Sequence, residues 1–124
     1  MTWQIEYSEA QDLVTVTVKG QINAAETAKM ALEGIALARE NNSNRFLIDY
    51  SHTQVQDTSL DTYEFMSGLE QLGIKRSDHI AFIIVRNKEA HHFAETVAAN
   101  RGWINLRYFS TREEALTWLD AKGE

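Results

Sequence analysis

Residues 47–65, LIDYSHTQVQDTSLDTYEF, contain the transition that decides the fold, because an apolar segment passes through a polar loop into a helical pattern. The apolar segment starts just upstream as RFLIDY, residues 45–50, and predicts a strand that presents apolar side chains to both faces of a sheet. The helical pattern ends near Gly73, which suits a helix stop, and its apolar positions are Leu60, Tyr63, Met66, Leu69 and Leu72.

Two alternating stretches precede this region. Trp3, Ile5 and Tyr7 alternate with polar residues, and a run of valines does the same over residues 14–18. Apolar residues at every second position predict half-buried strands, and the turn SEAQD between them predicts an antiparallel hairpin. A helical stripe follows the hairpin, made of Ala24, Ala28, Ala31, Ile35 and Ala38.

The downstream half repeats the strand and helix patterns. HIAFIIV, residues 79–85, is apolar without alternation and predicts a central strand covered on both faces. A helical stripe over residues 90–98 ends at Gly102, and INLRYF, residues 104–109, alternates as a strand does. Ser110 with Glu113 then predicts the cap of a last helix.

These patterns predict one α/β domain over residues 1–124, with a five-stranded, mostly parallel mixed sheet. An N-terminal hairpin and four helices complete it, in the order β-β-α-β-α-β-α-β-α, and the strands are expected to lie in the order 1-2-3-4-5. Right-handed crossovers that step in one direction place the crossover helices on one face. The opposite apolar face must then be covered by the last helix, by a dimer partner or by an apolar ligand.

Composition narrows the classes of function. The 124 residues are 44% hydrophobic and 24% charged, as in ordinary globular domains, and the net charge of −6 disfavours nucleic acid and anionic membrane surfaces as partners. The absence of cysteine excludes disulfides, thiolate zinc sites and cysteine nucleophiles. No signal-peptide pattern or membrane-spanning apolar run is present, so we expect a cytoplasmic protein.

No constellation of residues indicates catalysis. His91 and Glu95 lie one helical turn apart, but they lack the H-E-x-x-H pattern and an obvious third metal ligand. His52 lies in the loop after Asp49, where a lone histidine is usually a surface residue. Without a nucleophile elbow or a glycine-rich phosphate loop, we expect no enzyme, no metal and no cofactor.

The segment LIDYSHTQVQDTSL, residues 47–60, resembles the signature region of STAS domains, the family of the anti-sigma-factor antagonist SpoIIAA. The resemblance implies that Thr58, or Ser59 after it, is a phosphoacceptor for a partner kinase, with Asp57, Asp49 and His52 as neighbours in the switch loop. The alternative is that Asp57, Thr58 or Ser59 simply caps the following helix. We favour the cap over the switch, because Gln56 and Leu60 differ from the residues that flank this motif in the family.

Three further pieces resemble the SpoIIAA-like group of bacterial proteins, which is related to STAS and SEC14 domains. They are GQINAAE (residues 20–26), HHFAETVAANRG (residues 91–102) and YFSTREEALTWL (residues 108–119). This resemblance implies a non-enzymatic binding module for an apolar small ligand or lipid, with peripheral membrane contact and homodimer formation both open. The candidate lining of the apolar site is Tyr63, Met66, Phe93, Trp103 and Trp118. A regulatory protein switched at Thr58 or Ser59 is the second hypothesis.

Overall fold

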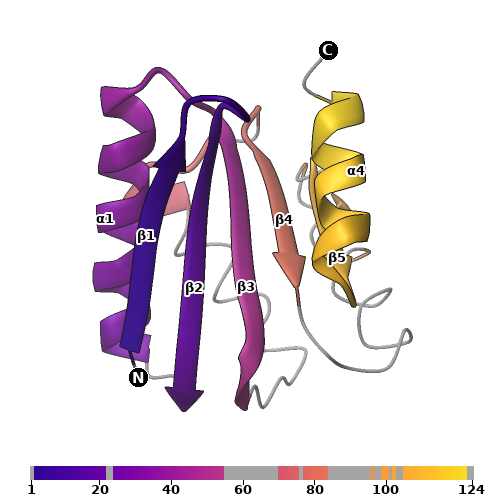
Figure 1. Ribbon diagram of the computed structural model, residues 1–124. Helices are drawn as coiled ribbons and strands as arrows, with labels where there is room; N and C mark the ends of the chain where they lie inside the picture. Colours follow the sequence, from indigo (N-terminus) through magenta and orange to yellow (C-terminus); the bar gives the residue numbers. More distant parts are fainter. Residues whose placement is uncertain are drawn as a thin grey trace.

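The computed structural model describes residues 2–21, 24–54, 70–75, 77–83, 96, 99–100, 102 and 105–122. These residues contain a five-stranded sheet in the order β1-β2-β3-β4-β5 (Figure 1). The hairpin pair β1–β2 is antiparallel and the other neighbouring pairs are parallel, which confirms the predicted mixed sheet and its strand order. The strands are β1 (Thr2–Ser8), β2 (Leu13–Gln21), β3 (Arg45–Gln54), β4 (His79–Ile83) and β5 (Leu106–Phe109).

The β1–β2 hairpin forms as its alternation predicts. Ile5 lies opposite Val16, and the side chains of Trp3, Ile5 and Tyr7 pack against the core on one face while the intervening residues are exposed. Asp12 closes the turn with a φ of 49°, and the Tyr7 hydroxyl donates a hydrogen bond of 3.0 Å to its carboxylate. A carboxylate that accepts from the phenol raises the pKa of Tyr7 above its usual value.

The hairpin turn is also joined to the start of β3, about thirty residues further along the chain. The hydroxyl of Ser43, a buried residue, donates to the carbonyl of Asp12 at 3.2 Å. The guanidinium of Arg45 donates to the carbonyl of Gln11 at 2.7 Å. These two side chains satisfy carbonyls that the hairpin itself leaves without ladder partners.

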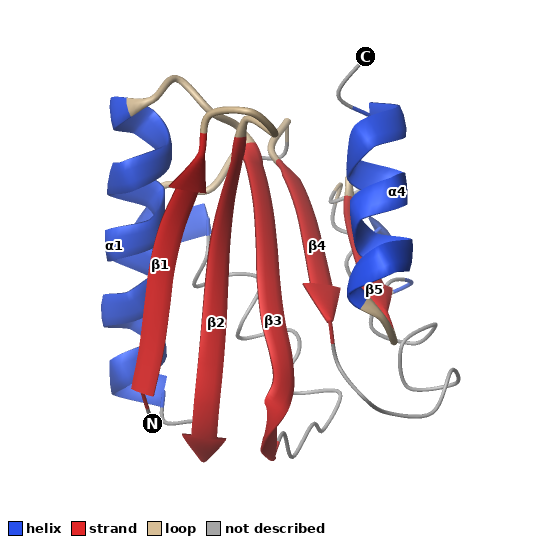
Figure 2. Cartoon of the chain, in the orientation of Figure 1, coloured by secondary structure: helices blue, strands red, loops and turns tan. Residues whose placement is uncertain are grey.

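Helix α1 (Ala24–Glu40) covers one face of the sheet (Figure 2). It packs on β1 and β2 alike, and its inward face belongs to the larger of two core clusters. The predicted stripe is confirmed at Ile35 and Ala38, both buried. Met30, also buried, is a member of this face that the predicted stripe did not include.

Helix α4 (Arg112–Lys122) covers the opposite face of the sheet and packs on β3, β4 and β5. Ala115 and Leu119 of this helix are fully buried in the second core cluster, which also contains Leu13, Leu47, Ala81 and Ile83 of the sheet. Of the three covers considered for this face, the last helix is therefore the one found. A sheet with apolar side chains on both faces needs such a second layer to exclude water.

The cap of α4 lies one residue later than predicted. The Thr111 hydroxyl accepts the N–H of Glu114 at 3.3 Å and donates to the Glu114 carboxylate at 3.0 Å. Ser110 and Glu113 have the same spacing, so the sequence pattern alone fits both pairs. The helix begins at Arg112, and this start turns Ala115 and Leu119 toward the sheet. Thr111 therefore occupies the capping position, and the later pair forms the cap.

The predicted count of four helices is corrected to three over the part of the chain that the structure describes. Three stretches there are helical over more than one residue: α1, residues 70–72 and α4. Residues 70–72 end the helix predicted to stop at Gly73, whose φ of 113° favours glycine. The predicted helix over residues 90–98 lies mostly outside the described residues. Within that range the structure describes Thr96, which is helical. Within the described ranges, no helix combines the length and apolar character needed to span a membrane.

An ion pair with a buried carboxylate fastens the C-terminal end of α1 to the segment before β4. The Arg39 guanidinium donates to both carboxylate oxygens of Asp78, at 2.8 and 3.2 Å. The backbone N–H of Lys75 adds a third bond to this carboxylate at 2.8 Å. The Asp78 side chain is 1% exposed and that of Arg39 is 35% exposed, so the carboxylate depends on these donors in place of water.

We expect Asp78→Ala to lower the free energy of unfolding by about 3 kcal/mol, because it leaves the Arg39 charge and the Lys75 N–H without their buried partner. The matched control is Asp120→Ala, since Asp120 contacts Arg45 at 3.4 Å but its side chain is 71% exposed. The control should change stability by less than about 0.5 kcal/mol. Urea denaturation followed by circular dichroism measures both, and equal losses in the two variants would contradict the assignment.

Candidate functional site

Most of the predicted site residues lie outside the part of the chain that the structure describes. These are Asp57, Thr58, Ser59, Tyr63, Met66, Phe93 and Trp103. Asp49, His52 and Trp118 lie within the described residues. The question whether the other seven form a switch or line an apolar site stays a prediction.

Asp49 lies in the middle of β3, on the same face of the strand as Leu47. It is 8% exposed, and its carboxylate accepts the backbone N–H of Ser51 at 2.8 Å. The pairing between β2 and β3 shifts register just after Asp49, and His52 beyond the shift is exposed beside Lys19. The bond to Ser51 therefore stabilises an irregularity in the strand, which accounts for a buried carboxylate at this position.

Trp118 belongs to the α4 side of the sheet. Its ring lies against Phe109 with centroids 5.7 Å apart, and against the His79 ring at 6.3 Å. This packing makes Trp118 part of the α4 layer. Among the described residues, no group of three or more potential ligands is placed to hold a metal ion.

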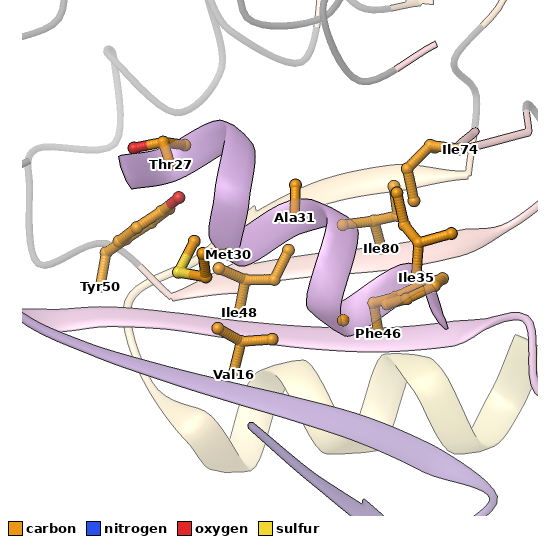
Figure 3. Close-up of a pocket in the computed structure, with 11 residues that line it drawn as sticks. Val16, Thr27, Met30, Ala31, Ile35, Phe46, Ile48, Tyr50, Ile74 and Ile80 are labelled. Atoms are coloured by element: carbon orange, nitrogen blue, oxygen red, sulfur yellow. The ribbon is translucent and has the colours of Figure 1, made fainter. Parts of the chain in front are cut away.

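An apolar cavity lies on the other side of the sheet, between α1 and strands β2, β3 and β4 (Figure 3). The cavity has a volume of about 30 Å³, room for about one water molecule, within a wider hollow that opens to solvent. Its lining is almost entirely aliphatic or aromatic. The lining residues are Val16, Thr27, Met30, Ala31, Gly34, Ile35, Phe46, Ile48, Tyr50, Ile74 and Ile80.

The two hydroxyl-bearing residues of the lining lie at one end of the cavity. Figure 3 shows Thr27 of α1 and Tyr50 of β3 together there, whereas Ile74 and Ile80 lie at the other end. Tyr50 is 6% exposed, and its ring stacks on Phe82 with an interplanar angle of 7°. The lining surface is thus almost wholly apolar, with the two hydroxyl-bearing residues at one end.

Local sequence explains how the cavity is built. Phe46, Ile48 and Tyr50 are alternate residues of β3, so their side chains point to the α1 face. On α1, Met30 and Gly34 are one turn apart, and Gly34 lies against Val16 of β2. Because Gly34 has no side chain, the helix leaves space above the strand where a larger residue would fill it.

Pattern reading found the surfaces that border the cavity but missed the cavity itself. The strand RFLIDY and the helical residues Ala31 and Ile35 were predicted to be buried. Most of these residues are buried, and Arg45, Ile48 and Ala31 are half-buried. A gap between two apolar layers depends on how closely they approach, which periodicity does not report. The one available signal was the spacing of Met30, Gly34 and Ala38, which places a long flexible side chain beside two small residues on one helix face.

Comparison with known protein families gives one result. The model of the SpoIIAA-like family matches residues 13–120. The matched range starts at the first residue of β2 and extends into α4, so it includes every residue that lines the cavity but leaves out β1. No curated protein matches the chain.

We expect Gly34→Ala to raise the free energy of unfolding by about 1 kcal/mol, because alanine is the better helix former and the added methyl group fits against Val16 without a clash. A Cβ at Gly34 would have Val16 Cγ2 as its nearest neighbour, at an ordinary contact distance of 3.6 Å. Ala36→Gly, at an exposed position of the same helix, is the control and should lower stability by a similar amount. Thermal unfolding measures both, and a destabilised Gly34→Ala would show that this space is filled.

Proposed function

The chain belongs to the SpoIIAA-like family, and we propose that it is a non-enzymatic binding module that takes an apolar small molecule, such as a lipid, between α1 and the sheet. The observation that carries the proposal is the apolar cavity with Thr27 and Tyr50 at one end. Sites for small molecules are concave and mostly apolar, with few polar groups that orient the ligand. This cavity has that composition.

The polar end suits a single hydroxyl, carbonyl or carboxyl group of a ligand. Each hydroxyl has one donor and two acceptor sites, so Thr27 and Tyr50 can bond a ligand in addition to a protein partner. The opposite end offers aliphatic side chains such as Ile74 and Ile80, which suit a hydrocarbon chain. The ligand would therefore lie along α1 with its polar group at the Thr27 end.

Binding requires the cavity to widen, because the enclosed part of the space is too small for a lipid-sized ligand. Met30 supports such a change. It is 3% exposed, lies in the middle of the lining near Ile48 and Tyr50 (Figure 3), and has an unbranched side chain with three rotatable bonds. Rotation of this one side chain would lengthen the cavity without moving the strands.

The test is retention of ligand by delipidated protein. After incubation with a mixture of fatty acids, fatty alcohols and monoacylglycerols, we expect native mass spectrometry to detect a one-to-one complex. Ala31→Leu fills part of the space that a ligand would occupy and should weaken retention roughly tenfold, equivalent to about 1.4 kcal/mol. Ala36→Leu adds the same atoms at an exposed position of α1 and should retain ligand as the wild type does.

Circular dichroism checks that both leucine variants are folded before their spectra are compared. A wild-type protein that stays free of ligand across the whole mixture would count against the proposal. Equal retention by Ala31→Leu and Ala36→Leu would show that a ligand binds elsewhere.

The alternative function is that of a regulatory protein switched by phosphorylation at Thr58 or Ser59. Its support is the family match, because the matched range of residues 13–120 includes both positions. The two functions differ in what the protein carries when it is purified from its own cell: a ligand in one case and a phosphate in the other.

Peptide mass spectrometry of protein purified from its native host distinguishes these functions. We expect the peptide that contains Thr58 and Ser59 to have its unmodified mass, because Gln56 and Leu60 favour a helix cap at this point. A stoichiometric phosphate that is lost in Thr58→Ala or Ser59→Ala would support the switch and overturn this expectation. Protein treated with phosphatase gives the reference mass.

A further inference from the structure

Strand β1 forms one edge of the sheet, as Figure 2 shows, because β2 is its sole strand neighbour among the described residues. The strand also lies before the residues that the family model matches. An edge strand presents a row of backbone N–H and C=O groups that can pair with another strand. The question is whether β1 carries any feature that prevents such pairing.

The two edges of the sheet differ in this respect. The opposite edge, β5, has four residues, and short edge strands limit pairing. β1 has seven residues, TWQIEYS, with an unbroken register against β2 and no proline, lysine or bulge. Proteins commonly protect their edges with those devices or with other charged side chains, and the one charged residue of β1 is Glu6.

We propose that β1 is the interface of a homodimer, in which it pairs antiparallel with β1 of a second copy about a two-fold axis through Ile5. The two sheets then form one continuous sheet, with the α1 helices of both copies on the same face. In this register all seven residues of β1 are paired: Ile5 lies opposite itself, Gln4 opposite Glu6 and Trp3 opposite Tyr7 of the second copy.

The pairing of Gln4 with Glu6 selects this register from its neighbours. With the axis at Ile5, each Glu6 lies opposite a Gln4 amide, which can donate a hydrogen bond to the carboxylate. With the axis at Glu6, two carboxylates lie opposite each other and only five residues pair, which is unfavourable. With the axis at Gln4, again only five residues pair.

The apolar face of the strand supports the same arrangement. Trp3, Ile5 and Tyr7 are each half-buried in the single chain, so part of each side chain is available to a neighbour. Their polar atoms already have partners, because the Trp3 indole N–H donates to Glu33 at 2.9 Å and the Tyr7 hydroxyl donates to Asp12. Pairing Trp3 with Tyr7 across the axis therefore buries ring surface without leaving a donor unsatisfied.

Helix α1 leaves room for the second copy. It packs on β1 and β2, and the cavity beneath it reaches β3 and β4, so the helix covers the face of the sheet inside this edge. The α1 helices of the two copies would then lie on the same face of the joined sheet.

The absence of cysteine makes the register directly testable, because any cross-link must come from an introduced residue. Gln4 and Glu6 are both exposed, so Gln4→Cys and Glu6→Cys should fold normally. We expect a mixture of the two variants to form the mixed disulfide in preference to either symmetric one, since residues 4 and 6 lie directly opposite. A preference for a symmetric disulfide would overturn the register.

Charge substitutions test the dimer without cross-linking. Gln4→Lys places a cation opposite each Glu6 and should tighten the dimer, whereas Gln4→Glu places like charges opposite and should weaken it, with dissociation constants roughly tenfold apart. Thr117→Lys and Thr117→Glu make the same charge changes at an exposed position of α4 and should differ little. Sedimentation velocity over a concentration series measures all four. A wild-type chain that stays monomeric throughout, or equal responses at residues 4 and 117, would overturn the proposal.

Discussion

The burial of β3 on both of its faces is the constraint on which the rest of the structure depends. Phe46, Ile48 and Tyr50 point to one side, and Leu47 and Asp49 point to the other. A strand with apolar side chains on both sides requires a layer of helix over each face, because neither face can be left to water. α1 supplies one layer and α4 the other, so the two core clusters are separated by the sheet and share no residues.

This division explains where a ligand can and cannot be accommodated. On the α4 side, small and branched residues meet closely: Ala115 and Leu119 are fully buried against Ala81 and Leu47. On the α1 side, Gly34 and the flexible Met30 leave a space beside longer side chains. The Arg39–Asp78 ion pair holds the C-terminal end of α1, whereas the two hydroxyls of the cavity lie toward the opposite end of that helix. The helix is thus fastened at the end away from the polar part of the cavity.

Sequence patterns were informative where the structure depends on periodicity. The alternation in β1 and β2 predicted the hairpin, and the non-alternating strand at residues 79–85 predicted a position inside the sheet. Sequence patterns were less informative where two pairs of residues satisfy the same rule. In the cap of α4, Ser110–Glu113 and Thr111–Glu114 have the same spacing. They did not reveal the cavity, because a space between layers depends on distances in three dimensions. Predictions at Thr58, Ser59 and the four unplaced lining residues concern a part of the chain outside the described ranges.

The link between the hairpin turn and β3 has a consequence for how the chain tolerates change in length. Hairpin tips usually accept insertions, because they are exposed and make few contacts. Here the carbonyls of Gln11 and Asp12 accept hydrogen bonds from Arg45 and Ser43, so the tip is also part of the support of the next strand. A fused peptide or a new chain terminus at this tip would therefore disturb the sheet interior. Surface position alone is a poor guide to where this protein can be lengthened or cut.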